Sequence, residues 1–254
     1  MSSMKTYVGC CGYCLARSKY YTVFNAVELQ ETFYNIPGTD KLKRYRDEAP
    51  ESFVFSLKAW QAITHPLDSP TWRKAKHVPD KSLSNRYGFL RPTKEVFEAW
   101  EKVVEAVEIL NAKVVVIQTP PSFGYSEENY RNALEFFSTV DTDRFVIGWE
   151  PRGSWLQNLD KVADIVSRFR NVVEIVDPLK RFPTVVKSVA YFRLHGLGEH
   201  DVNYRYNYTD EDLERLCIIV KDLSSRNLEE IYIMFNNIYM AQNASRFKQL
   251  CIIS

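Results

Sequence analysis

The chain has 254 residues, and its 33 basic and 32 acidic side chains give a formal net charge of +1. This balance supplies no global electrostatic reason to bind nucleic acid. Hydrophobic residues make up 45% of the chain, and no apolar run approaches the length of a membrane span. The length is typical of one domain, which we place at residues 1–254, and the absence of a secretory pattern predicts a cytoplasmic protein.

Short β-rich runs that finish in polar residues recur along the chain. They cover residues 6–12, 26–30, 53–58, 114–118, 145–150, 172–177, 189–195 and 230–237. Stretches with helical spacing of apolar residues separate most of these runs, and strands that alternate with helices pair in parallel through crossovers. The pattern predicts an α/β fold, a single (β/α)₈ barrel of the TIM type.

The helical stretches differ in strength. Segment 94–111 places Val96, Trp100 and Val103 on one face, and segment 209–227 starts with Thr209 three residues before Asp212, which is typical of a capping box. Weaker helical patterns cover residues 126–139, 158–170, 241–251 and 39–48. Segment 178–188 contains two prolines, so we expect an irregular connection or a single turn there.

The connection after the third strand, residues 60–93, is unusually long and rich in aromatic residues. A loop of this length in a compact domain is usually functional or disordered, and the aromatic residues favour a lid. A packed cover that closes one end of the barrel is an equally good interpretation. Stacking on a ligand and packing at the rim are both open for Trp60, Trp72, Tyr204 and Tyr206.

In such a barrel the carboxyl ends of the strands form the active face, so polar residues that end the strands are expected to converge. These residues are Gln30, Lys58, Gln118, Glu150, Arg152, Asp177, Arg193, His195, Asn236 and Asn237, with Glu28 on the second strand and His65 in the long connection. We assign catalytic roles to His195, Glu150 and Lys58, and ligand binding to the others.

Structural interpretations of the same residues stay open. Glu28 and Gln30 have the same strand parity and suit a buried polar layer. Lys58 is able to pair with Glu28 or Glu150, and Glu150 with Arg152. Asp177 precedes Pro178 and suits a turn, and the amides of Asn236 and Asn237 suit backbone groups at the end of a strand.

Arg193 and His195 also share strand parity, so both side chains should point the same way. Burial under the outer helices would leave their donors unsatisfied, which favours the barrel mouth. The guanidinium suits phosphate binding, and the imidazole suits proton transfer.

The five cysteines do not form a metal motif. Cys217 and Cys251 occupy apolar helix faces, which predicts reduced, buried thiols, and Cys10, Cys11 and Cys14 lack a fourth thiol nearby. Divalent metal binding by carboxylates and imidazoles is a separate interpretation, with Glu28, Glu150, Asp177, His65 and His195 as the ligand types. No local ligand signature supports it, so the cofactor is left unassigned.

Two basic clusters, at residues 41–46 and 74–76, have a simpler interpretation. On exposed segments such clusters are usually a solvated face, although a local basic surface remains a second interpretation.

Seven short motifs agree, in order, with one known family. They are Gly9-Cys10-Cys11-Gly12, Val27-Glu28-Leu29-Gln30, Phe55-Ser56-Leu57-Lys58-Ala59, Gln118-Thr119-Pro120-Pro121-Ser122-Phe123, Trp149-Glu150-Pro151-Arg152, Arg193-Leu194-His195-Gly196 and Phe235-Asn236-Asn237. Over essentially the whole chain the sequence resembles the YecE-like family, domain of unknown function seventy-two. The resemblance implies a TIM-type barrel and an uncharacterised activity.

This chain departs from the pattern of that family at three places. The family usually has Gly-x-Ser-Gly-Trp at residues 9–13, Asn at Gln30 and an Arg-His pair at Arg152-Gly153. These departures indicate a divergent branch and weaken any mechanism that needs a histidine after Arg152.

Two classes of function are consistent with the sequence. The first is an enzyme that acts on a phosphorylated or polyhydroxylated substrate, which includes nucleic acid by analogy with barrel endonucleases. The second is a non-catalytic binder of a nucleotide, nucleic acid or another phosphate-bearing ligand. Neither a membrane nor a protein partner is implied, and the absence of a glycine-rich phosphate loop argues against a nucleotide-driven motor.

Overall fold

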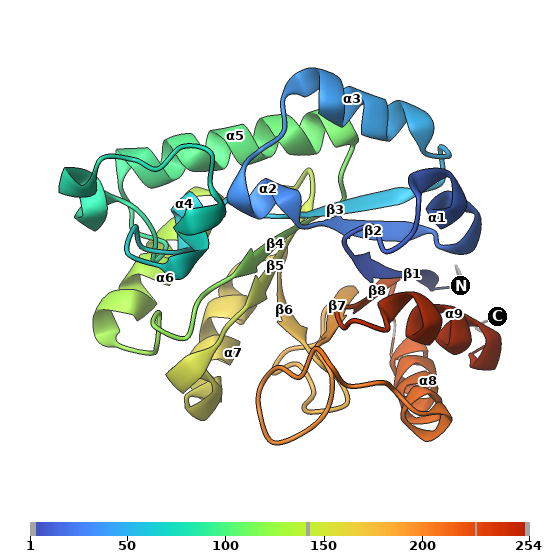
Figure 1. The fold of residues 1–254 in the computed structure, drawn as a ribbon. Coiled ribbons are helices and arrows are strands. Elements are labelled where there is room, and N and C mark those ends of the chain that lie inside the picture. Colours follow the sequence, from blue (N-terminus) through green and yellow to red (C-terminus); the bar gives the residue numbers. More distant parts are fainter. Residues whose placement is uncertain (1–3, 141–142, 227, 252–254) are drawn as a thin grey trace. The chain divides into compact units, whose positions relative to one another are not determined.

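The computed structural model describes residues 4–140, 143–226 and 228–251. Its strands are parallel and, in chain order, form a closed barrel of eight (Figure 1), which confirms the predicted fold. The strands are β1 (Lys5–Cys11), β2 (Ala26–Leu29), β3 (Val54–Lys58), β4 (Val114–Gln118), β5 (Val146–Glu150), β6 (Val172–Val176), β7 (Val189–Leu194) and β8 (Glu230–Phe235). Each agrees with its predicted run to within two residues at either end.

Helices connect most of the strands. The α-helices are α1 (Arg17–Val23), α2 (Glu31–Tyr34), α3 (Thr39–Glu48), α4 (Gln61–Thr64), α5 (Lys94–Leu110), α6 (Glu127–Thr139), α7 (Leu159–Arg168), α8 (Asp210–Ser224) and α9 (Met240–Leu250). The 3₁₀ helices are η1 (Pro70–Lys74), η2 (Lys81–Arg86) and η3 (Gly153–Gln157). The six predicted helices are present, although residue 227, the predicted end of one of them, lies outside the described residues. No helix in the described ranges is long and apolar enough to cross a membrane.

Side-chain caps fix the ends of the two longest helices. The Thr209 hydroxyl accepts a hydrogen bond from the backbone N–H of Asp212, and the Asp212 carboxylate accepts one from the backbone N–H of Thr209, which completes the predicted capping box of α8. Thr93 caps α5 in a simpler way, and α5 stops at Asn111 in the left-handed conformation, with φ of 50°.

The connection between β6 and β7 has no helix, as the two prolines predict. Glu174 of β6 is 2% exposed and orders this connection from inside. Its carboxylate accepts hydrogen bonds from the backbone N–H and the hydroxyl of Thr184, and it pairs with Arg181 at 2.6 Å. The buried carboxylate of Glu174 therefore holds this connection against the sheet, as a packed helix does elsewhere in the barrel.

The chain divides into two compact units. Unit 1 comprises the N-terminal part through Glu28, Ala49–Val54 and the residues from Val173 onward, and unit 2 comprises Leu29–Glu48 and Phe55–Val172. Unit 1 thus holds β1, nearly all of β2, most of β6, β7, β8 and the helices α1, α8 and α9. Unit 2 holds most of β3, β4, β5 and the remaining helices.

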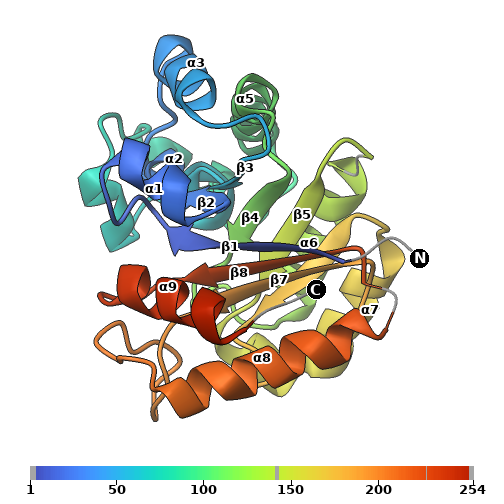
Figure 2. The same ribbon diagram turned by 90° about the vertical axis from the view of Figure 1, so that its right-hand side faces the viewer.

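In unit 1, α9 packs against β1, β8 and α8 (Figure 2). A disulfide joins Cys217 of α8 to Cys251, directly after α9, with Cα atoms 5.4 Å apart. The prediction of reduced thiols is wrong for this pair. Each cysteine does occupy an apolar helix face, but α8 and α9 pack with those faces together, which brings the sulfur atoms within bonding distance.

In unit 2, α3 lies against α5, and aromatic as well as aliphatic side chains are buried in its core. Trp155 is fully buried, its ring centre is 5.1 Å from that of Trp149, and its indole N–H donates to the carbonyl of Phe123. Within this unit the long connection 60–93 is not a plain loop. It holds α4, η1 and η2, and the buried Trp72 donates its indole N–H to the Pro66 carbonyl.

Candidate functional site

Unit 1 contains a buried ion pair beside the end of β2. Arg193 Nη2 donates to Glu28 Oε1 at 3.0 Å, and the two side chains are 1% and 0% exposed. Tyr191 and Cys11 donate to the other carboxylate oxygen, at 2.9 and 3.5 Å. Glu28 therefore has a charged donor on one carboxylate oxygen and neutral donors on the other. This environment agrees with the interpretation of Glu28 as a buried polar residue.

Tyr191 was missed by the sequence analysis. Tyr191 and Arg193 are two residues apart on β7, so their side chains leave the same face of the strand. The strand period that paired Arg193 with His195 also applies to Tyr191 and would have found it.

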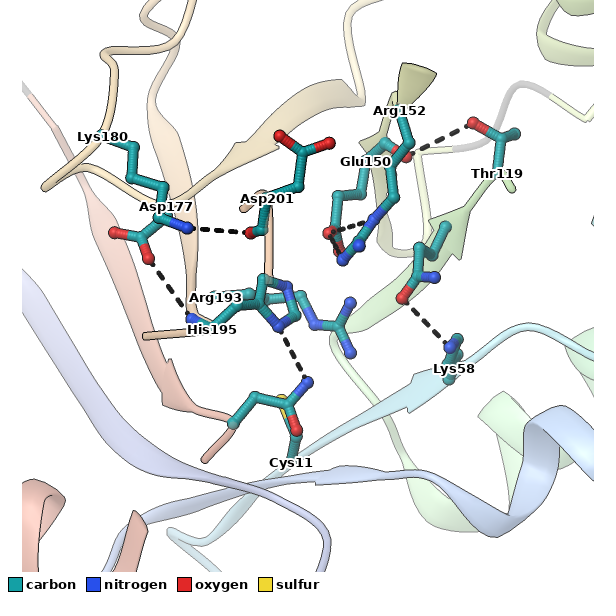
Figure 3. A network of polar contacts seen from close by, with 12 residues as sticks. Cys11, Lys58, Thr119, Glu150, Arg152, Asp177, Lys180, Arg193, His195 and Asp201 are labelled. Atoms are coloured by element: carbon teal, nitrogen blue, oxygen red, sulfur yellow. Dashed lines mark hydrogen bonds and ion pairs between the residues drawn. The ribbon is translucent and has the colours of Figure 1, made fainter. Parts of the chain in front are cut away.

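His195 follows β7 and is 4% exposed (Figure 3). Its Nδ1 lies 3.1 Å from Asn236 Nδ2, and its backbone N–H donates to Asp177 Oδ2 at 3.3 Å. An amide nitrogen only donates, so in this contact Nδ1 accepts, which corresponds to the tautomer with its proton on Nε2. The structure thus brings Asp177, His195 and Asn236 together.

Asp177 also shapes the turn after β6. Its Oδ1 accepts from the backbone N–H of Leu179 at 3.1 Å, and its carbonyl accepts from Lys180 and Arg181. The predicted turn role is observed, with a second carboxylate oxygen left to hold the backbone of His195.

Gly196 lets the chain turn directly after His195. It has φ of +83°, where a side chain is strained, and its N–H donates to the Tyr208 hydroxyl at 2.7 Å. This turn fixes the position of His195 at the end of β7.

Asn237 has a structural environment. Its Nδ2 donates to the Tyr206 carbonyl and to Asn243 Oδ1, both at 2.7 Å, and the residue is 4% exposed. These bonds tie the connection after β7 to α9, which agrees with the predicted role of satisfying backbone groups.

Unit 2 places a second polar group at the ends of β3, β4 and β5. Lys58 Nζ donates to Gln118 Oε1 at 3.1 Å and lies 4.1 Å from the ring centre of Phe33. Thr32, on the same short helix as Phe33, donates its hydroxyl to the Lys58 carbonyl at 2.7 Å. The helix α2 therefore fixes both the backbone and the ammonium of Lys58, a role of Thr32 that the sequence analysis did not assign.

Glu150 and Arg152 complete this group. Arg152 Nε donates to Glu150 Oε1 at 3.0 Å, its Nη2 contacts the same oxygen, and the side chains of Arg152 and Glu150 are 12% and 8% exposed. Glu150 is the register partner of Gln118 in the β4–β5 ladder. We call Lys58, Gln118, Glu150 and Arg152 the Lys58 set.

His65 reports the charge of the Lys58 set. The side chain is 5% exposed, follows α4, and has its Nδ1 2.8 Å from the Thr64 hydroxyl. Burial, and then the positive charges of Lys58 and Arg152, lower the pKa of His65 to about 3. The imidazole is neutral at pH 7, in a local field that is positive. Gln30 directly precedes α2 and is half-buried. Its side chain makes no capping hydrogen bond to the N-terminus of that helix.

The thiols of unit 1 differ sharply from one another. Cys10 and Cys14 have sulfur atoms 3.4 Å apart, and Cys10 is fully buried. The hydrogen bond between Cys14 and Cys10 lowers the pKa of Cys14, whereas burial, followed by the charge of Glu28, raises the pKa of Cys11. Among the described residues, no group of three histidine, cysteine, aspartate or glutamate side chains is arranged to hold a metal ion.

Comparison with known proteins identifies the family and the fold. The family model described as Protein of unknown function DUF72 matches residues 16–252. No curated protein matches the chain. A DUF72 family protein from Enterococcus faecalis V583 is 19% identical, with 98% of each chain covered and a TM-score of 0.69.

Two further solved structures show the same fold. A DUF72 family protein from Thermotoga maritima MSB8 is 24% identical over 97% of this chain and 98% of that chain, with a TM-score of 0.66. Endonuclease IV from Thermus thermophilus is 11% identical over 98% of each chain, with a TM-score of 0.52. Identities this low establish the fold alone.

Proposed function

We propose, for a chain that belongs to the DUF72 family of proteins of unknown function, an enzyme that acts on a phosphorylated substrate. The observation that supports this most is the Lys58 set. Two cations and one carboxylate, all largely buried, stand at the carboxyl ends of neighbouring parallel strands, where barrels of this type bind their ligands.

The roles follow from the contacts. Lys58 and Arg152 bind anionic oxygens, and Gln118 and Phe33 hold the Lys58 ammonium in place. A phosphate that binds Arg152 competes with Glu150 for the guanidinium. The carboxylate of Glu150 is then released to accept a proton from a nucleophile.

His195 is proposed to donate a hydrogen bond from Nε2 to a substrate oxygen at the end of β7. The hydrogen bond from Asn236 holds the ring with its proton on Nε2, and Asp177 fixes the backbone. Arg193 is assigned a positioning role in place of direct substrate binding, because its guanidinium is 1% exposed and paired with Glu28.

The fold of endonuclease IV is compatible with a phosphoester substrate, including nucleic acid, but this is an analogy of fold. The alternative is a binder that holds a phosphate-bearing ligand through the same two cations without chemistry. Turnover separates the two proposals.

Histidine NMR tests the binding step directly. Inorganic phosphate at Lys58 and Arg152 offsets the two charges that lower the pKa of His65, so we expect that pKa to rise as phosphate is added. Lys58→Gln should weaken this phosphate response about tenfold. The control is Lys113→Gln, which removes a lysine directly before β4, at the opposite end of that strand. If millimolar phosphate leaves the pKa of His65 unchanged, the proposal is contradicted.

The catalytic step is tested with phosphomonoester and phosphodiester substrates. We expect Glu150→Gln to abolish turnover while the phosphate response of His65 persists. Phosphate binding by the wild-type protein without any product from these substrates would favour the binder.

A further inference from the structure

Unit 2 contains a second basic region, beside the helix that follows β2. It is a cavity of about 720 Å³ whose walls come from α2 and the residues after it, from η1 and the residues after it, and from single residues before α4, on α3 and on α5. The charged and aromatic residues that define it are Lys41, Lys74, Lys76, Lys102, Tyr34 and Trp60. We call it the lysine cavity. No member of the Lys58 set lines it.

The charge of this cavity is unbalanced. Four lysines face one carboxylate, Glu31, which is already occupied by Lys41 at 2.5 Å and by the Tyr45 hydroxyl at 2.6 Å. Within the part of the chain that the structure describes, Lys74, Lys76 and Lys102 take part in no ion pair. Three ammonium groups around one cavity repel one another, and an anionic ligand would relieve this repulsion.

The aromatic walls lie next to these charges. Lys74 Nζ is 5.1 Å from the ring centre of Tyr34, and Lys102 Nζ is 5.3 Å from that of Trp60. The indole N–H of Trp60 is buried and has no hydrogen-bond partner among the described residues. Flat rings beside ammonium groups suit a ligand that joins an aromatic group to an anion.

The cavity is built on ordered backbone. Asn35 Oδ1 accepts from the backbone N–H of Lys76 at 2.6 Å, and Asn35 Nδ2 donates to the Lys74 carbonyl at 3.2 Å. One amide thus clamps the segment that carries two of the lysines onto the end of α2, which carries Tyr34. The solvated-face interpretation of residues 74–76 does not account for this clamp or for Lys41 and Lys102 on the same cavity.

We propose that the lysine cavity binds a nucleotide unit, with the phosphate on Lys74, Lys76 and Lys102 and the base against Tyr34. Its volume lies in the usual range for small-molecule sites. A free nucleotide and one nucleotide of a single strand share this chemistry. The site is separate from the Lys58 set and does not depend on the function proposed for it.

Histidine NMR and calorimetry distinguish the two sites in one protein. His77 lines the lysine cavity, whereas His65 reports the Lys58 set. Adenosine monophosphate should shift the His77 resonances, and Lys74→Gln/Lys76→Gln should weaken its binding there at least about tenfold. The charge-matched control Lys43→Gln/Lys94→Gln removes two exposed lysines that do not line the cavity, and should change the affinity less than about twofold.

Further probes identify the ligand. Tyr34→Leu should weaken adenosine monophosphate but not inorganic pyrophosphate, because only the nucleotide has a base to stack. A short oligothymidylate that binds His77 more tightly than the mononucleotide identifies a single strand as the source, and the reverse order identifies a free nucleotide. The proposal is overturned if millimolar mononucleotide and oligothymidylate leave the His77 resonances unchanged. It is also overturned if Lys43→Gln/Lys94→Gln loses as much affinity for the mononucleotide as Lys74→Gln/Lys76→Gln does. A third contrary outcome is pyrophosphate that binds as tightly as the mononucleotide, with Tyr34→Leu changing the affinity for neither ligand.

Discussion

Two polar groups at the carboxyl ends of strands differ in how their charges are satisfied. In unit 1, Glu28 and Arg193 are buried and pair with each other, and Tyr191 and Cys11 also donate to the carboxylate. In unit 2, Lys58 has a neutral amide as hydrogen-bond partner, and Arg152 pairs with Glu150 while its side chain is 12% exposed. The first group is closed to ligands, and the second retains a positive field.

The pKa of His65 shows the difference. Burial lowers this pKa most, and the positive charges of Lys58 and Arg152 lower it further, so a positive field remains at the position of His65. Similar residue types at similar strand positions therefore serve different purposes. Mutual pairing of a carboxylate and a guanidinium in the interior indicates a structural role, and a residual field near the surface indicates binding.

The largest expected effect, on the free energy of unfolding, comes from breaking the buried pair of Glu28 and Arg193. Glu28→Gln removes the carboxylate that pairs with the buried Arg193 guanidinium, and should lower the free energy of unfolding by about 3–5 kcal/mol. Urea denaturation measures this loss. The matched control in unit 1 is Asp222→Asn, which removes an exposed pair with Arg226 and should cost at most about 0.5 kcal/mol. Equal losses of unfolding free energy in the two variants would show that the buried pair stabilises the fold no more than the exposed pair does.

The second effect is a pH dependence that His65 contributes. Its pKa is about 3 in the folded state and near 6.5 when unfolded, so between these values the unfolded chain binds a proton that the folded chain does not. The contribution is complete above pH 6.5 and is lost as pH falls toward 3. From pH 7 to pH 5 the free energy of unfolding should fall by about 2 kcal/mol on account of His65.

The variant His65→Gln isolates this contribution. It should be about 2 kcal/mol less sensitive than the wild type over the same pH interval, whatever its own stability at pH 7. Identical slopes for the two proteins would contradict a neutral, buried His65 beside two cations.

The smallest effect is a difference in thiol reactivity around the closed group. Burial and the charge of Glu28 raise the pKa of Cys11 and keep it protonated, whereas the hydrogen bond between Cys14 and Cys10 lowers the pKa of the half-buried Cys14. Because the thiolate is the nucleophile, iodoacetamide at pH 8 should modify Cys14 before Cys10 and Cys11. Timed alkylation followed by peptide mass spectrometry tests this order, and Cys14→Ser should abolish the fast phase. Alkylation of Cys11 at the rate of Cys14 would contradict it.

The secondary structure was predictable because it rests on local patterns. The apolar face of segment 94–111 and the Thr209–Asp212 capping box are complete within one helix, and both are observed. The side-chain period of β7 likewise places Tyr191 and Arg193 on one face. Local sequence patterns did not predict the disulfide between Cys217 and Cys251. Whether these two cysteines meet depends on the packing of segments that are 34 residues apart in the sequence.

The sequence by itself determined the barrel, its family and the positions at strand ends where polar residues gather, since each depends on periodicity or on short motifs read along the chain. Only the tertiary structure decided what each charge does. Glu28 and Arg193 are 165 residues apart and neutralise each other, while lysines from three segments surround one cavity without acidic partners to match them. The physical reason is that pairing and desolvation act between residues that the fold brings together, and spacing in the sequence does not record that distance.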